Sequence, residues 1–426
     1  MPKQSEKLYT RRQAVGGMIA SATALSFLDT NTFTADSNLA AIDTKDDLKI
    51  TKLETFFVQP RSVFLKISTN AGIIGWGEPT LEAKAETVAT EVADLARYLI
   101  GKDPRQIARH WDAMYRTLYR GGPVKMSAIS GVDHALWDIT GKAYGVPVWK
   151  LLGGPFRDRI RLYWDPMGFD PPDLLSKKIH DEGYTAIKIS AFSWSGGKTE
   201  RPTDVVRGTT KYFDAIIANF LETREVVGTG VDIIFHGGGN DYRQNMYMIK
   251  ALEPYNLLFF EIHANNHNID DLAEVQSKTY IPIATGEDMY SKWEFRDVLV
   301  KNAARVLMVD MTHSGGITET RNIAAMADAF ERTISPHNAQ GVINLAAGLQ
   351  LAASIPNFLI IETTDRGIES SDVNGWYGSW RGVDILKEPF QVVDGHIALP
   401  TKPGLGFEID ENKLANHITD KPWLMR

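Results

Sequence analysis

Five short apolar runs between residues 231 and 338 constrain the fold more than any other feature of the sequence, and a polar residue closes nearly every one. Each run has the length of a strand buried on both faces, and helix-like sequence separates successive runs. Parallel strands that alternate with helices indicate an α/β barrel. The runs are VDIIFHG (231–237), LLFFEIH (257–263), IPIATGE (281–287), RVLMVDMTH (305–313) and RTISPHN (332–338).

Polar residues at the carboxyl ends of barrel strands form the active site of such folds. The five runs therefore predict a site at one mouth of the barrel. A single polar residue in this place could be a simple strand cap, but five in successive units favour a functional site. The residues are His236, Glu261, Glu287, Asp310 and His337.

Three further runs complete a barrel of eight strands. Ile160–Trp164 is predicted as the first strand, Thr185–Ser190 as the second and Phe358–Thr363 as the eighth. The second strand carries Lys188 and the eighth carries Glu362. The expected fold class is therefore α/β, with a modified (β/α)8, TIM-like barrel over residues 156–370.

The residues before the barrel have a different pattern. ITKLETFFV, SVFLKISTN and GIIGWGE alternate as antiparallel strands do, and helical patterns follow in 83–99, 107–119 and 127–141. Strands followed by helices indicate an α+β domain over residues 46–155. In residues 371–426, turn signals at 394–395 and 403–404 indicate a short hairpin that returns to this domain.

Composition excludes several classes of protein. The chain has 426 residues, which is enough for two domains. A formal net charge of −7 disfavours nucleic acid or an anionic membrane as the main partner. The absence of cysteine excludes structural disulfides and thiolate chemistry.

The first 45 residues are predicted to be an export signal and linker. Arg11 and Arg12 precede a weakly apolar stretch of small residues from Ala14 to Leu28, which is typical of a twin-arginine signal. This stretch is too short for a membrane span. We therefore expect a periplasmic or otherwise exported protein with no membrane partner after export; the alternative is a disordered basic tail.

Taken together, these motifs resemble the enolase superfamily, in its mandelate racemase and muconate-lactonizing group, and most nearly the galactonate dehydratase type of acid-sugar dehydratase. The resemblance covers about residues 48–410 and implies an α+β capping domain over a modified barrel. It also implies abstraction of a proton next to a carboxylate, with an enediolate held on Mg²⁺. The pieces that carry it are GWGE, SAISGVDHALWDITGKAYGVPVWKLLGG, AIKIS, IPIATGE, VDMTHSGGITE, SPHN, IIET and PGLGFEID.

The family binds its metal with three acidic residues on strands three, four and five. Glu261 matches the second ligand and Glu287 the third, but the position of the first is occupied by Ile234. Mg²⁺ prefers hard oxygen ligands in an octahedral shell, so this change predicts a weakened Mg²⁺ site. Nearby histidines, His236 and His263, would suit a softer metal.

The resemblance assigns roles to the other residues. His337 matches the family base, and Asp310 matches the carboxylate that partners it. A carboxylate bonded to one imidazole nitrogen fixes the tautomer and raises the basicity of the other nitrogen. His236 matches the acid that protonates a departing hydroxyl. Lys188 and Glu362 match residues that bind the substrate carboxylate, and Glu362 would have to be protonated to donate a hydrogen bond there.

The expected function is that of an acid-sugar (aldonate) dehydratase-like lyase acting on a small sugar acid. Two alternatives remain open at this point. One is an epimerase or cycloisomerase on a related acid, and the other is a sugar-acid-binding homologue whose metal site is impaired by Ile234. A homo-oligomer is expected from the family.

Overall fold

The computed structural model describes residues 47–59, 61–117, 119–166, 172–191, 205–237, 242–262, 268–363 and 385–420. The predicted export signal in residues 1–45 and His263 lie outside the described residues.

The α+β domain begins with the predicted antiparallel meander, β1 (Ile50–Val58), β2 (Ser62–Thr69) and β3 (Ile74–Gly77), paired in that order. Helix α4 packs on β2 and β3, and α2 packs on β1 and α4. These contacts give the domain a core of its own. The helices are α2 (Ala85–Leu99), α3 (Ile107–Tyr115) and α4 (Pro123–Tyr144).

Helix α4 joins this domain to the barrel. Pro123 stands in its first turn, where the missing N–H costs no hydrogen bond, and Gly145 ends it in the left-handed conformation. An added Cβ at Gly77 of β3 would collide with the main chain of Gly131 in α4. The two glycines therefore allow strand and helix to approach closely, which explains part of the GWGE motif.

Eight parallel strands form the barrel, as predicted, and each begins within three residues of its expected start. Strand β11 pairs with β4, and the main chain beside it closes the barrel against β10. Ile334 N donates to Asn357 O at 2.9 Å, and Leu359 N donates to Ile334 O at 2.8 Å. The strands are β4 (Arg159–Trp164), β5 (Ala186–Ser190), β6 (Asp232–Gly237), β7 (Phe259–Ile262), β8 (Ile283–Thr285), β9 (Val306–Leu307), β10 (Thr333–Ile334) and β11 (Ile361–Thr363).

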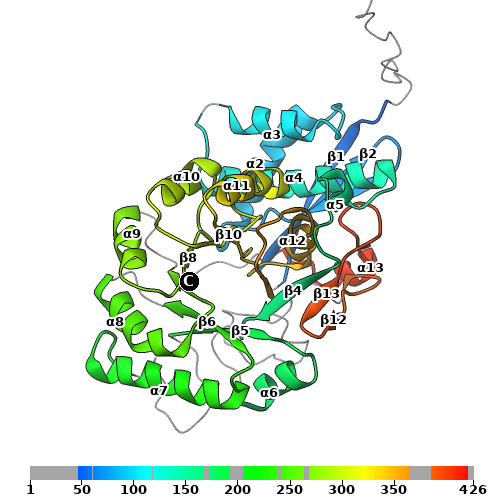
Figure 1. Cartoon of the computed structure of the whole chain (residues 1–426). Coiled ribbons are helices and arrows are strands. Elements are labelled where there is room, and N and C mark those ends of the chain that lie inside the picture. Colours follow the sequence, from blue (N-terminus) through cyan, green and yellow to red (C-terminus); the bar gives the residue numbers. More distant parts are fainter. Residues whose placement is uncertain are drawn as a thin grey trace, which may run out of the picture. The chain divides into compact units, whose positions relative to one another are not determined.

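Helices alternate with the strands and lie outside them (Figure 1). Their apolar faces and the outward side chains of the strands form the largest core cluster. The helices are α5 (Val148–Leu151), α6 (Pro172–His180), α7 (Thr210–Val227), α8 (Tyr242–Leu252), the 3₁₀ turn Glu253–Tyr255, α9 (Ile269–Ser277), α10 (Lys292–Val300), α11 (Gly316–Ala329) and α12 (Val342–Ser354).

The inside of the barrel is layered. A layer of mainly apolar side chains fills its middle, and charged side chains lie on both sides of that layer along the strands. Arg161 and Asp232 pair at 2.7 Å near the amino ends of their strands. The middle layer consists of Tyr163, Ala186, Ile234, Phe259, Ala284, Val306, Met308 and Ile360.

The carboxyl-terminal segment differs from the expectation in one respect. The hairpin of β12 (Val392–Val393) and β13 (His396–Ala398) pairs with β4 of the barrel, not with the α+β domain. Described residues after the hairpin return to that domain, where Leu405 N donates to Asp138 Oδ1 of α4 at 2.9 Å. The sequence shows the turn at 394–395. It does not show which strand the hairpin pairs with, because that strand is distant in the sequence and no local signal specifies it.

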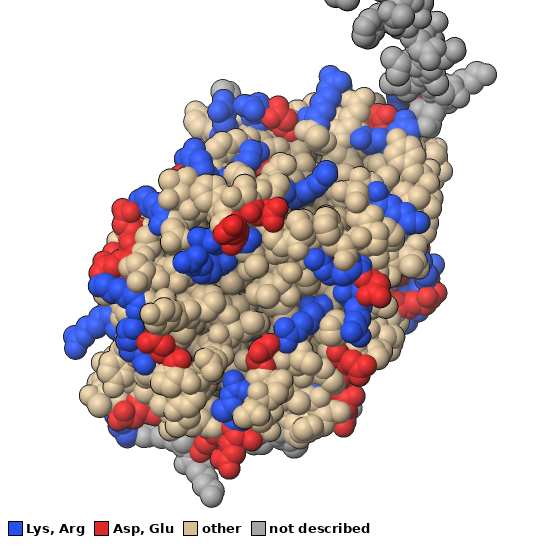
Figure 2. Space-filling view, in the orientation of Figure 1, with Lys and Arg blue, Asp and Glu red and all other residues tan. Residues whose placement is uncertain are grey.

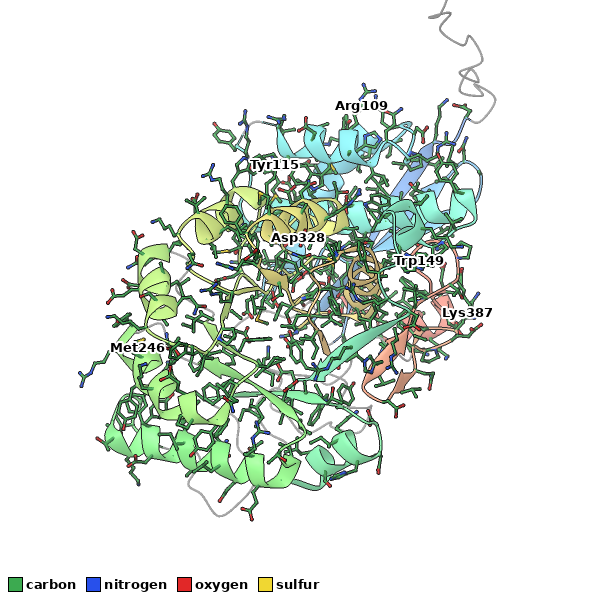
Figure 3. The ribbon with its side chains drawn as sticks, in the orientation of Figure 1. Arg109, Tyr115, Trp149, Met246, Asp328 and Lys387 are labelled. Carbon is green, nitrogen blue, oxygen red and sulfur yellow. The ribbon has the colours of Figure 1, made fainter. Side chains whose placement is uncertain are left out.

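Aromatic stacking also joins the two parts of the fold. Tyr115 of α3 (Figure 3) stacks on Trp293 of α10 with ring centroids 4.8 Å apart, and on Trp111 at 5.1 Å. The Lys292 ammonium lies 4.3 Å from the Trp293 ring centroid. Such contacts fix the α+β domain over the carboxyl-terminal side of the barrel.

The face of the molecule in Figure 2 carries acidic and basic side chains interspersed, without a broad region of one sign. Within the described part of the chain, no helix combines the length and the apolar character that a membrane span needs.

Candidate active site

The predicted pair of Asp310 and His337 is present beyond the ends of β9 and β10. His337 Nδ1 lies 2.7 Å from Asp310 Oδ2. The other carboxylate oxygen, Oδ1, accepts hydrogen bonds from Thr312 N at 2.7 Å and from Asn344 Nδ2 at 3.3 Å. Both members of the pair are buried, so Asp310 holds one tautomer and one orientation of the imidazole.

Electrostatics make the pair strongly ionic. Burial opposes ionisation of Asp310, but His313, His337 and the Thr312 hydrogen bond lower its pKa below the usual value. Burial likewise opposes protonation of His337, but Glu287, Glu362 and Asp310 raise its pKa to about 10. The resting pair is therefore a carboxylate and an imidazolium at neutral pH.

The free nitrogen of His337 faces the mouth of the barrel. Nε2 lies 3.4 Å from Glu287 Oε2 and 3.6 Å from Glu362 Oε2. A substrate bound beside this nitrogen would therefore also lie next to the carboxylates of Glu287 and Glu362, which follow or belong to two other strands.

Lys188 of β5 lies at the centre of the site. Its Nζ is 2.9 Å from Glu362 Oε1, 3.2 Å from Asp165 Oδ2 and 3.3 Å from Glu261 Oε2, and the side chain is almost fully buried. Burial alone would lower the pKa of Lys188, but the surrounding carboxylates raise it well above its usual value. The lysine is a permanent cation that links strands β4, β7 and β11.

Glu362 does not have the protonation state expected from the sequence. Burial raises its pKa, but Lys188 and His337 lower it well below the usual range, so the group is a carboxylate. Asn338 N donates to its Oε2 at 3.0 Å. Glu362 therefore accepts hydrogen bonds and cannot donate one to a substrate; the expectation from burial alone neglected the two cations that the fold places beside it.

Glu261 and Glu287 follow neighbouring strands, β7 and β8, as predicted. Glu261 is 1 % exposed, and neither of its carboxylate oxygens accepts a hydrogen bond within the described part of the chain. Burial raises the pKa of Glu261 to about 8, Lys188 opposes this rise and the nearby Glu287 adds to it. At neutral pH Glu261 is therefore largely protonated, and a nearby positive charge would favour its ionised form.

The third side of the expected metal site is apolar. Ile234 of β6 is fully buried in the middle layer of the barrel and pairs in register with Lys188. Asp232, two residues earlier, is committed to Arg161 at the amino end of its strand. Neither residue offers an oxygen to a cation beside Glu261 and Glu287.

His236 is half-buried at the carboxyl end of β6, in register with Glu261. It lies on the same face of the strand as Ile234, one step nearer the mouth. Even so, no three acidic, histidine or cysteine side chains among the described residues converge closely enough to hold a metal ion. The three-carboxylate Mg²⁺ site that the resemblance implies does not fit the residues present.

Sequence reasoning missed two residues in the site. Asp165 closes the first barrel strand, so the rule applied to the five later strands would have found it. His313 stands in the VDMTHSGG motif, but nothing local shows its contacts: Nδ1 lies 2.9 Å from Glu287 O and Nε2 lies 3.3 Å from Glu82 Oε2 of the α+β domain. Glu82 and Asp310, against the effect of burial, raise the pKa of His313 to about 9.

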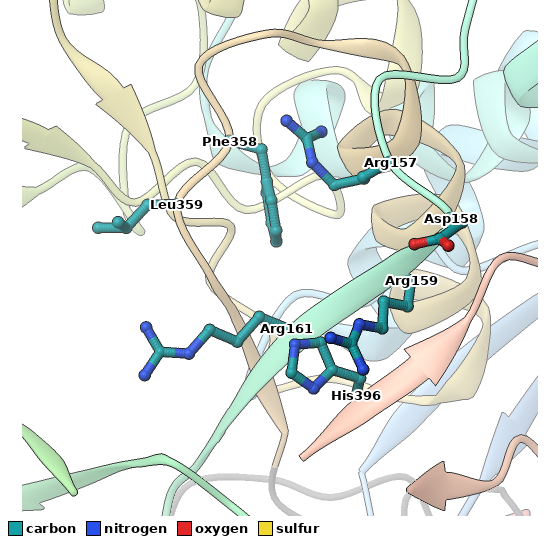
Figure 4. A pocket seen from close by; sticks show the side chains of 7 residues that line it. All are labelled: Arg157, Asp158, Arg159, Arg161, Phe358, Leu359 and His396. Atoms are coloured by element: carbon teal, nitrogen blue, oxygen red, sulfur yellow. The ribbon is translucent and has the colours of Figure 1, made fainter. Parts of the chain in front are cut away.

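A basic pocket at the amino-terminal side of the barrel is separate from this site (Figure 4). Its volume is about 280 Å³, and Arg157, Arg159, Arg161 and His396 line it with Phe358. Arg161 is neutralised by Asp232, and Arg157 donates to main-chain oxygens at the end of α12. The pocket has no link to the pair of Asp310 and His337.

Comparisons with known proteins agree with the fold. Residues 50–153 match the mandelate racemase / muconate lactonizing enzyme N-terminal domain, and residues 173–413 match the enolase C-terminal domain-like family. The chain is similar to proteins named D-galactonate dehydratase. It is 38 % identical over 385 residues to that of Pectobacterium atrosepticum and 40 % identical over 388 residues to that of Xanthomonas campestris pv. campestris; each alignment covers 88 % of this chain and 96 % of the relative.

Solved structures give the same result. An enolase from Agrobacterium radiobacter, with bound sodium and L-malate, superposes with a TM-score of 0.77 and 29 % identity, over 89 % of this chain and 97 % of that one. A mandelate racemase/muconate lactonizing enzyme-like protein from Rubrobacter xylanophilus gives 0.76 and 28 %, over 88 % and 98 %. The chain therefore belongs to the mandelate racemase/muconate-lactonizing family of the enolase superfamily.

Proposed function

We propose that this protein is a hydro-lyase that removes water from a sugar acid of the galactonate type. The observation that carries the proposal is the pair of Asp310 and His337 at 2.7 Å, whose Nε2 faces a mouth that also contains Lys188. The names of the relatives supply the substrate class, an aldonic acid.

The reaction divides into two bond-breaking steps. His337 Nε2 takes the proton from the carbon next to the carboxylate, and the electron pair moves into the carboxylate to give an enediolate. The β C–O bond then breaks as the pair returns to form C=C, and the departing oxygen takes a proton and leaves as water. The enol that remains becomes a 2-keto-3-deoxy acid, so atoms and electrons balance.

Each residue has a defined part in these steps. Asp310 orients His337 and stabilises the imidazolium that forms. Lys188 offers a fixed positive charge to the substrate carboxylate, where negative charge grows in the transition state. Protonation of the departing hydroxyl is assigned to His236, which ends β6 in register with Glu261. No step is assigned to a metal, because the described residues do not complete the expected site.

His337 can accept the substrate proton only while its imidazole is neutral. Because its pKa is raised to about 10, that form is a minor one at pH 7. The proton-abstraction rate is therefore expected to rise with pH through the neutral range.

The test is incubation of purified protein with D-galactonate in deuterated water. Exchange of the α-proton, followed by appearance of a 2-keto-3-deoxy acid, supports the proposal. Exchange with inversion at the α-carbon and no loss of water would instead support an epimerase. Binding of the acid with neither reaction would support the binding-protein alternative.

We also propose export through the twin-arginine pathway, on the basis of Arg11 and Arg12 before the apolar stretch. Changing both arginines to lysine is expected to leave the protein in the cytoplasm of the producing cell. Fractionation of cells that carry either form tests this, and unchanged export of the lysine variant would exclude that pathway.

A further inference from the structure

One buried amide lies between the pair of Asp310 and His337 and the last barrel strand. Asn344, in the first turn of α12, is fully buried, and its Nδ2 donates to Asp310 Oδ1 at 3.3 Å and to Asn338 Oδ1 at 3.1 Å. Asn338 directly follows His337 in the chain. The two donors of one amide group are therefore shared between the carboxylate behind the base and the residue next to the base.

Asn338 extends this connection to Glu362. Its main-chain N donates to Glu362 Oε2 at 3.0 Å, and its Nδ2 donates to Glu362 O at 3.4 Å. Because Asn338 Nδ2 faces a carbonyl oxygen, Oδ1 of the same amide faces the donor of Asn344. A chain of hydrogen bonds therefore runs from Glu362, which pairs with Lys188 at 2.9 Å, through both asparagines to Asp310.

The orientation of the Asn344 amide is fixed by its partners. If the group were turned over, its oxygen would face the oxygens of Asp310 and Asn338, and neither contact would be a hydrogen bond. In the observed orientation, Asn344 Oδ1 is buried and has no hydrogen-bond partner among the described residues. A buried acceptor without a partner costs free energy, and a leucine would fill a similar volume without that cost. Packing alone therefore does not account for an amide at this position, whereas its two donors do.

The α+β domain holds the main chain of Asn344. Glu78, the last residue of the GWGE motif, is fully buried and accepts hydrogen bonds from Gly341 N at 2.7 Å and from Asn344 N at 3.0 Å. These main-chain N–H groups belong to the start of α12, where a helix offers them no acceptor of its own. An added Cβ at Gly341 would lie 2.6 Å from Glu78 Oε1, so a side chain there would displace the carboxylate. Glu78 therefore fixes the position from which the Asn344 amide reaches the site.

We propose that Asn344 is a positioning residue, which holds the pair of Asp310 and His337 in a fixed orientation relative to Glu362. Both members of the pair lie beyond the last paired residues of β9 and β10, so side-chain hydrogen bonds contribute to their spacing. Asn344 acts through Asp310 and Asn338 and is assigned no contact with the substrate. The inference rests on the proposed function for the reaction that the pair performs, but the chain of hydrogen bonds does not depend on that function.

Loss of the Asn344 donors should affect proton abstraction more than substrate binding. Asp310 keeps its hydrogen bonds from Thr312, but it loses the bond that fixes its position relative to Asn338. Misorientation of the base lowers the rate directly, so kcat for α-proton exchange in D-galactonate should fall at least about tenfold. KM should change by less, because Lys188 and Glu362 keep their direct contact.

The experiment compares Asn344→Leu with a matched variant of the same helix in the full chain. Gln350 is a second fully buried amide of α12, but it accepts from Trp149 N at 2.8 Å and donates to Leu405 O at 3.0 Å, outside the site. Gln350→Leu should lower Tm and leave kcat and KM unchanged. Asn344→Ser is a smaller change that also removes the amide, and it should lower kcat in the same direction if the leucine variant does not fold.

An NMR signal of the base provides a readout that needs no turnover. His337 Nδ1 lies 2.7 Å from Asp310 Oδ2 and is buried, so its proton should give a signal protected from exchange with water in protein labelled with ¹⁵N-histidine. His337→Gln identifies this signal by removing it. The Asn344 variants should shift or broaden it, and Gln350→Leu should leave it unchanged.

Two results overturn the inference. One is a kcat for the Asn344 variants equal to that of Gln350→Leu, and the other is a His337 signal that the Asn344 variants leave unchanged. The proposed function is judged separately, by α-proton exchange in the unsubstituted protein. If that protein shows no exchange, the function is removed and the His337 signal alone decides the inference. If it shows exchange that the Asn344 variants do not slow, the inference is removed and the function is kept.

Discussion

The two sides of the active site differ in how completely the chain hydrogen-bonds their buried acidic and basic groups. On the side of β9, β10 and β11, every buried polar group of the pair Asp310 and His337 has a partner supplied by the chain. On the side of β6, β7 and β8, Glu261 has no hydrogen bond among the described residues and Ile234 offers no donor. The chain itself therefore holds the pair of Asp310 and His337, whereas the described residues give Glu261 no hydrogen bond.

This difference separates two requirements of enolisation. A base must be oriented in advance, because misorientation reduces the rate directly. The described residues supply the oriented base through Asp310 and His337, and Lys188 supplies positive charge at the same mouth.

The largest effect on activity is expected from substitutions in the pair of Asp310 and His337. His337→Gln or Asp310→Asn should each lower α-proton exchange by roughly 10²–10⁴-fold, the range for general-base catalysis. The double variant should lose little more, because residues that act as a unit are non-additive. Exchange measured by NMR in deuterated water gives all three rates.

Asp133→Asn is the matched control for this prediction. Asp133 is also a fully buried carboxylate, but it accepts hydrogen bonds from Thr318 between α4 and α11 and is not assigned a part in the reaction. Its replacement should lower stability and leave exchange unchanged. Multiplicative losses in the double variant of the pair would show that Asp310 and His337 act independently.

A smaller effect is expected at the junction of the site with the α+β domain. His313 lies between Glu82 of that domain and Asp310, with 3.3 Å to Glu82 Oε2 and 4.0 Å to Asp310 Oδ2. Glu82→Gln and His313→Gln should lower kcat about tenfold, since Asp310 loses a neighbouring positive charge that keeps it ionised. KM should change less, because neither residue is assigned a contact with the substrate.

His110→Gln provides the comparison for a purely structural histidine. His110 is a buried imidazole of α3 that lies 3.0 Å from Tyr98 Oη and 2.8 Å from Asp103 O, within the α+β domain. Its loss should reduce thermal stability with no change in kcat or KM. If the His313 variant behaves in the same way, then His313 only supports the fold.

The sequence predicted the architecture because the signals for it are local. Apolar runs, turn residues and the polar residue after each strand placed all eight barrel strands and both members of the Asp310 and His337 pair. The fold class is confirmed by the structure and by the family comparison. The sequence also shows that Ile234 replaces an acidic metal ligand of the family, because a single position in a strand can be compared with the family motif.

Properties that depend on several distant residues were not readable. The ionised state of Glu362 follows from Lys188 on β5 and His337 after β10, which only the closed barrel brings together. The bridge from Glu82 to His313 likewise crosses 231 positions in the sequence. Burial can be guessed from a pattern, but the balance of buried charges requires the tertiary contacts.

The smallest expected effect concerns pH, and it moves activity and stability in opposite directions. His337 and His313 have pKa values raised to about 10 and about 9, above the usual 6.5. The stability that their ion pairs contribute is fully present below pH 6.5 and is lost as pH rises through the folded-state values. Proton abstraction gains over the same interval, because neutral His337 becomes more abundant.

We therefore expect both the free energy of unfolding and Tm to fall between pH 6.5 and 9.5, while exchange accelerates. Calorimetric melting and NMR exchange across this range measure the two trends. The His337→Gln variant should show a flatter dependence of Tm on pH, because one of the two groups is gone. A stability that rises toward pH 9.5 would mean that Asp310 and His337 are not an ion pair in the resting protein. The contrast between the two sides would then lose its electrostatic basis.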